Sequence, residues 1–157
     1  MPTETILSVC AFALLSLADL RYRTVPAIEV FFLGVLLLAI PANPINSFLV
    51  VLAVFWGLIR SWPGVLVWPM LFVPSAWPVL LIGYGVRVGV VGRADLLAAG
   101  ALAVLFPWPA LIFSFVGLEL WRRWWTSRRA GLVPALPGMF LGLSVYLLGM
   151  VISGYGG

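Results

Sequence analysis

The chain has no histidine and only one cysteine, Cys10, among its 157 residues. A lone cysteine cannot form an internal disulfide, and without histidine there is no His-containing zinc site and no Ser-His or Cys-His catalytic relay. Any acid and base chemistry must therefore use carboxylates. We expect no metal and no organic cofactor.

Charged residues are also scarce. They make up 9% of the chain, against 64% hydrophobic residues, and the mean hydropathy is +1.17. A soluble domain of this length could not bury so much apolar surface. No basic segment precedes the first apolar stretch, and Asp19–Arg23 follows it where a signal peptide would have small residues before its cleavage site. The composition predicts a multi-pass protein of the cytoplasmic membrane whose first helix is retained.

Lysine is absent as well, so all nine basic residues are arginines. They stand in short groups between apolar stretches, at residues 21–23, at Arg60, at residues 87–93 and at residues 122–129. This distribution is typical of cytoplasmic loops and not of a nucleic-acid-binding surface. Trp121–Trp125 combines arginine with indole rings, which predicts an anchor at the lipid headgroups.

Apolar stretches occupy most of the remaining sequence, at residues 5–20, 27–40, 46–60, 64–73, 77–90, 95–106, 108–120 and 132–153. Several are shorter than the roughly 20 residues that a membrane-spanning helix needs, and prolines interrupt them. We predict one all-α domain over residues 1–157, a bundle of about six transmembrane helices with a possible short proline-rich hairpin at residues 64–90. Both termini are expected outside the cell.

Aspartate occurs only twice, as Asp19 and Asp95, each in a short polar break at the edge of an apolar stretch. A carboxylate at the rim of the bilayer costs free energy unless it has a partner or a function. An even number of membrane crossings between the two aspartates would place both on the same face of the membrane. The neighbouring arginines predict that this face is the cytoplasmic one. In a simpler interpretation, Asp19 pairs with Arg21 or Arg23, and Asp95 is the N-cap of its helix.

Two segments resemble the aspartate motifs of the type IV prepilin peptidase family. Ala18–Pro26 is similar to the first motif, in which an aspartate ends one helix and a Val-Pro pair opens the next. Gly89–Leu97 is similar to the second motif, of Gly-x-Gly-Asp type, and most similar to the Gly-Gly-Ala-Asp variant of the archaeal preflagellin peptidase branch. Val133–Phe140 resembles the proline- and glycine-containing start of the family's last helix. The order and spacing of the motifs carry the resemblance.

The resemblance implies a membrane-embedded aspartic endopeptidase. It would remove the short basic leader, or class III signal peptide, of a pilin-like or archaellin-like precursor at the cytoplasmic face, without a methyltransferase part. Asp19 and Asp95 would be the catalytic residues. The supporting residues would be Gly92, Arg93, Ala94, Arg21, Arg23 and Pro26, and a possible substrate-side loop would contain Pro134, Pro137 and Gly138.

The chain departs from the family pattern at two positions. Ala27 stands where asparagine is usual, and Leu97 stands where lysine is common. With no lysine in the chain, a stabilising cation would have to be an arginine. Among the glutamates, Glu119 is expected to pair with the arginines three and four residues later, and Glu29 is a weaker candidate for a supporting role.

Two other functions compete with this interpretation. One is an intramembrane protease of the presenilin and signal-peptide-peptidase type, since Pro134–Pro137 looks like the Pro-Ala-Leu motif of that group. Against it, Ala18 replaces the tyrosine expected before the first aspartate, and the chain is short for the scaffold helices. The other is a non-enzymatic membrane transport or assembly protein with structural acids.

Overall fold

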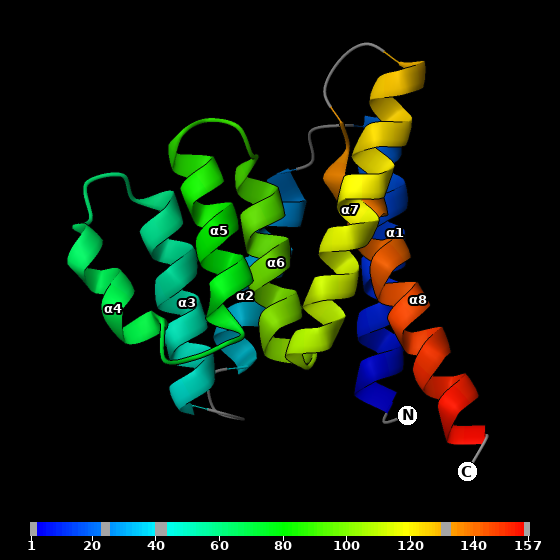
Figure 1. Ribbon diagram of the computed structural model, residues 1–157, viewed down its shortest axis with the longest axis horizontal. Helices are drawn as coiled ribbons and strands as arrows, with labels where there is room; N and C mark the ends of the chain where they lie inside the picture. The colour runs from blue at the N-terminus through cyan, green and yellow to red at the C-terminus, as the bar shows by residue number, and fades with distance from the viewer. Residues whose placement is uncertain (1–2, 23–25, 40–43, 130–132, 156–157) are drawn as a thin grey trace. The chain divides into compact units, whose positions relative to one another are not determined.

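The computed structural model describes residues 3–22, 26–39, 44–129 and 133–155 (Figure 1). Within these ranges there are eight α-helices, one short 3-10 helix and no strand, so the all-α prediction is confirmed. The helices are α1 (Thr3–Tyr22), α2 (Pro26–Ala39), α3 (Pro44–Leu58), η1 (Gly64–Leu66), α4 (Val67–Met70), α5 (Ala76–Arg87), α6 (Arg93–Leu105), α7 (Trp108–Arg128) and α8 (Ala135–Tyr155).

The helices divide into two compact units. Unit 1 combines residues 1–25 with residues 112–157, and unit 2 comprises residues 26–111. The first and last parts of the sequence therefore pack together, and the middle of the chain forms a separate core.

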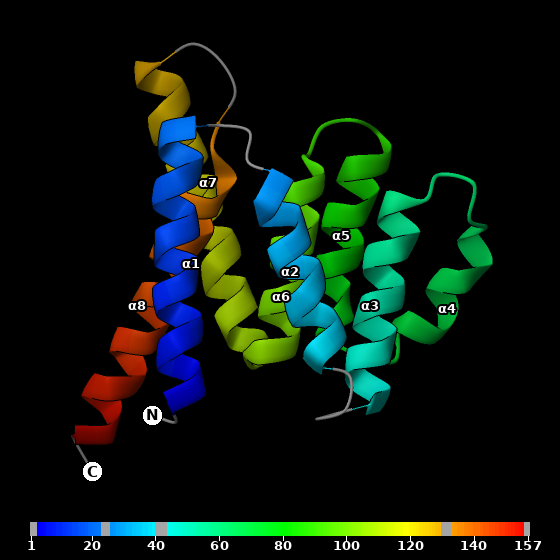
Figure 2. The same ribbon diagram turned by 180° about the vertical axis from the view of Figure 1, so that it is seen from behind.

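In unit 1, α1 packs antiparallel to α8 (Figure 2). The rings of Phe12 and Phe140 have centroids 6.0 Å apart. One turn further along α1, the buried Ser16 hydroxyl donates to the Phe12 carbonyl at 2.8 Å and to the Leu136 carbonyl at 3.3 Å. The end of α1 is thereby fixed beside the start of α8.

Glycines bring α7 and α8 into close contact in the same unit. A Cβ added to Gly117 would lie 2.5 Å from the Gly138 carbonyl oxygen, and one added to Gly142 would overlap the Phe113 carbonyl oxygen. Gly138 and Gly142 are four residues apart and so lie on one face of α8. Small residues at this spacing allow two helix backbones to approach closely, as is common between membrane helices.

In unit 2, α6 is the central helix and packs against α2, α3 and α5. Every residue from Leu96 to Ala103 is buried. A Cβ on Gly57 of α3 would lie 2.6 Å from the Cα atom of Gly83 of α5, so these two helices also touch at a glycine pair. Helices α2 and α3 lie side by side and run in opposite directions (Figure 2).

The proline-rich segment at residues 64–90 does not form one long helix. It folds as η1 and α4, a bend at residues 71–75, and then α5. The Trp77 indole N–H donates to the Leu71 carbonyl at 2.8 Å and holds the bend. The prolines predict an interruption of the apolar sequence here, and the structure has one between α4 and α5.

Among the described residues, one helical stretch is both long and apolar enough to cross a membrane: Ala135–Gly154, 20 residues with a mean hydropathy of 2.0. Helices α2, α3, α5 and α6 have 14, 15, 12 and 13 residues. At 1.5 Å per residue they are only about 18 to 23 Å long, less than the roughly 30 Å of the hydrocarbon core. Helices α1 and α7 are longer than these four helices, and each contains more charged residues than any of the four or than α8.

Candidate active site

Asp19 lies in the last turn and a half of α1, where it is partly exposed. It follows Ser16 by three residues, so the two side chains leave the helix on the same side. Because Ser16 contacts the carbonyl of Leu136, Asp19 lies at the end of unit 1 where α8 begins. The buried Pro134 immediately precedes that helix.

The residues predicted to support Asp19 have different positions. Arg21 is exposed in the last turn of α1. Pro26 is the first residue of α2, as predicted, and its missing N–H costs nothing there because the first N–H groups of a helix have no intrahelical acceptor. Arg23 lies outside the described residues.

The predicted substrate-side loop is wrong for two of its three residues. Pro137 and Gly138 lie in the first turn of α8 and are buried. Proline is tolerated in the first turn of a helix, and a Cβ on Gly138 would lie 2.8 Å from the Cα atom of Leu118. Both residues therefore belong to the helix, and Gly138 serves its contact with α7.

Asp95 is not the N-cap of α6, contrary to the simpler interpretation. Gly92 is the N-cap, in an extended conformation, and Asp95 is the third residue of the helix. Its Oδ2 atom accepts a hydrogen bond from the Gly92 N–H at 3.3 Å. The carboxylate thus folds back over the helix start, where a negative charge is favourable because several N–H groups lack acceptors.

The small residues before Asp95 leave room for this carboxylate. A Cβ on Gly92 would lie 3.1 Å from Oδ2 of Asp95, closer than most such contacts. Arg93 is exposed and Ala94 is partly buried. Further along α6, the buried face packs closely against α3, because a Cβ on Gly100 would lie 2.5 Å from Cγ2 of Val54.

Arg87 has a role that the sequence did not reveal. Its Nη2 atom donates to three carbonyl oxygens just beyond the end of α3, at distances of 2.6 to 3.2 Å, and its guanidinium lies 4.3 Å from the centroid of the Trp56 ring. The three acceptors are the carbonyls of Ile59, Arg60 and Trp62. Arg87 therefore ties the end of α5 to the end of α3, beside the turn that leads to α6.

The predicted ion pairs of Glu119 are confirmed. Its carboxylate accepts from the side chains of Arg122 and Arg123, both at 2.8 Å. The hydrogen bond to Glu119 raises the pKa of Arg122 above its ordinary value. This carboxylate is already engaged by two cations on its own helix.

Each aspartate thus lies at the end of its unit where the arginines gather. In unit 1 that end contains the end of α1, the end of α7 and the start of α8, with Asp19 and the arginines at 21, 122, 123, 128 and 129. In unit 2 it contains the ends of α3 and α5 and the start of α6, with Asp95 and all three arginines of that unit, at 60, 87 and 93. We call these the arginine ends.

In the part of the chain that the structure describes, no three cysteine or acidic side chains are grouped so that they could hold a metal ion. Comparisons with family models, curated proteins and solved structures gave no match to this chain.

Proposed function

We propose that the protein is a membrane-embedded aspartic endopeptidase in which Asp19 and Asp95 meet and activate a water molecule. The observation that supports this most is the placement of each acid within its own unit. The two aspartates of the chain both lie at arginine ends. Since arginine-rich ends are typical of the cytoplasmic face, both acids are expected on the same side of the membrane.

The proposed chemistry requires both acids. A water that attacks a peptide carbonyl must lose a proton, and the leaving nitrogen must gain one. Two carboxyl groups close together cannot both be ionised at low cost, so they share one proton and supply a base and an acid at the same time.

The protein is proposed to cross the membrane several times, with the arginine ends in the cytoplasm and both termini outside. The length and apolar composition of Ala135–Gly154 support one of these crossings. For the shorter helices, the bilayer would thin locally, or flanking turns would extend the apolar length. Close glycine contacts at the α7–α8 and α3–α5 crossings are in keeping with helix packing in lipid.

The proposed substrate is a pilin-like or archaellin-like precursor with a basic leader before an apolar helix. The apolar helix would lie in the bilayer, and the leader would extend into the cytoplasm. The scissile bond would then lie at the depth of the arginine ends. This match of depth, together with the two motifs, favours such a substrate over a fully buried transmembrane segment.

The function is tested by reconstituting the full chain in vesicles with a panel of such precursors. Wild-type protein should cut between the leader and the apolar helix, with or without a metal chelator. Asp19→Asn and Asp95→Asn should each slow cleavage at least about 100-fold, the lower range for loss of an acid or base catalyst. Glu119→Gln, which removes a carboxylate already paired with arginines, should cleave normally. Full cleavage by either Asn variant would overturn the proposal.

A further inference from the structure

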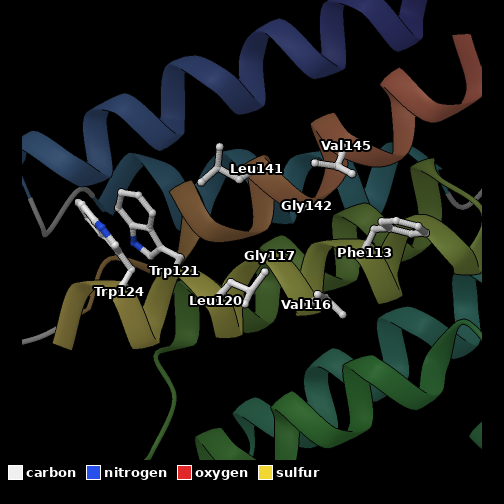
Figure 3. A pocket seen from close by; sticks show the side chains of 9 residues that line it. All are labelled: Phe113, Val116, Gly117, Leu120, Trp121, Trp124, Leu141, Gly142 and Val145. Atoms are coloured by element: carbon white, nitrogen blue, oxygen red, sulfur yellow. The ribbon is translucent and has the colours of Figure 1, made fainter. Parts of the chain in front are cut away.

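A groove in unit 1 runs along α7 and α8 and encloses about 400 Å³ (Figure 3). Tryptophan side chains lie at one end of it and Phe113 and Val145 at the other. The walls of the groove are almost entirely apolar. Because its two glycines have no side chain, the surface between α7 and α8 is hollowed there. The lining residues are Phe113, Val116, Gly117, Leu120, Trp121, Trp124, Leu141, Gly142 and Val145.

The tryptophan end of the groove is strongly basic. The rings of Trp121 and Trp124 have centroids 5.1 Å apart, and the guanidinium of Arg128 lies 5.1 Å from the centroid of Trp124. Arg122 and Arg123 are on the same stretch of α7 and share the single carboxylate of Glu119. Positive charge therefore exceeds negative charge at this end.

We propose that the groove binds one anionic phospholipid, with an acyl chain along its apolar walls and the phosphate at Arg128. From Phe113 to Trp124 the groove follows about 16 Å of helix. This is roughly half of the 30 Å hydrocarbon core, which is the depth that an acyl chain of one leaflet occupies. Arginine suits the phosphate because its planar guanidinium can donate two parallel hydrogen bonds.

Charge decides against a second copy of this chain as the occupant, because it would bring the same arginines to the same end. An anionic lipid of the cytoplasmic leaflet has the complementary charge. The inference depends on membrane location but not on peptidase activity.

The test is native mass spectrometry of the full chain in neutral detergent, with phosphatidylglycerol or phosphatidylcholine added. Wild-type protein should bind phosphatidylglycerol at least about fivefold more tightly, and Arg128→Gln should remove about fivefold of its affinity, the effect expected of one arginine near the headgroups. Arg60→Gln, the same change at an exposed site in unit 2, should have no effect. Val145→Trp should fill the groove and weaken both lipids, whereas Ile152→Trp, exposed on the same helix, should not.

Equal binding of the two lipids, or equal effects of Arg128→Gln and Arg60→Gln, would overturn the inference. Displacement of phosphatidylglycerol by a precursor peptide would also overturn it, because the groove would then be a substrate site. Asp19→Asn should keep the lipid whether or not cleavage is lost. The lipid site and the peptidase function can therefore fail independently.

Discussion

Replacing Asp95 with asparagine and with alanine separates its catalytic role from its structural one. An asparagine side-chain oxygen can still accept the Gly92 N–H, so Asp95→Asn keeps the hydrogen bond that closes the start of α6. It loses the favourable charge at the helix N-terminus, at a cost of about 0.3 to 1 kcal/mol. Asp95→Ala also loses the capping hydrogen bond, which costs about 1 kcal/mol more.

These costs are too small to abolish activity by unfolding. A domain with an unfolding free energy of about 5 to 15 kcal/mol stays almost fully folded after losing 2 kcal/mol. A purely structural Asp95 therefore predicts near-normal cleavage by both variants. A catalytic Asp95 predicts that both lose at least about 100-fold in rate, although only the alanine variant is clearly less stable.

The assay measures precursor cleavage in vesicles and unfolding of the same preparations in detergent. The predicted result is that activity falls equally in the two variants while stability falls more in Asp95→Ala. Near-normal cleavage by Asp95→Asn would refute the catalytic assignment and leave the aspartate as a helix cap.

Two further predictions concern packing and topology. Gly142→Ala should lower the free energy of unfolding by at least about 2 kcal/mol, because its Cβ would overlap the Phe113 carbonyl. Gly149→Ala, which has open space around it, should change it by less than about 1 kcal/mol, and equal effects would contradict the α7–α8 contact. With the native cysteine replaced by serine, a cysteine at Ser61 should react with a membrane-impermeant thiol reagent only from the cytoplasmic side, and one at Ser153 only from outside. Labelling of both from one side would contradict the proposed topology.

Local features of the fold could be predicted from the sequence. The Val-Pro pair predicted the start of α2 at Pro26, and the spacing of Glu119 from Arg122 and Arg123 predicted their ion pairs. These interactions depend on residues within one or two helical turns. The sequence pattern determines them without any knowledge of tertiary packing.

The helix start at Gly92 was missed although the sequence contains a pattern for it. In one form of the capping box, glycine is the N-cap and an acidic residue follows three positions later. Here Gly92 is the N-cap and Asp95 is the acidic residue. The four-residue spacing of Gly138 and Gly142 likewise indicated a close helix contact. A prediction that places Gly138 in a loop does not contain this contact, because the contact depends on one face of a continuous helix.

The role of Arg87 could not be predicted in the same way. Its acceptors lie 25 to 28 residues earlier in the chain. Finding them requires knowing that the ends of α3 and α5 lie together. That arrangement follows from tertiary packing at the Gly57 and Gly83 contact, which no local pattern specifies.

The proximity of the two aspartates is the central claim, and thiol crosslinking tests it most directly. In a chain without Cys10, cysteines at positions 19 and 95 should be joined within one molecule by a short bifunctional thiol reagent in native membranes. The matched pair at positions 19 and 153, which lie at opposite ends of unit 1, should not be joined. If both single cysteines react with the reagent but the pair at 19 and 95 is never crosslinked, the two carboxylates do not meet and the proposed mechanism is wrong.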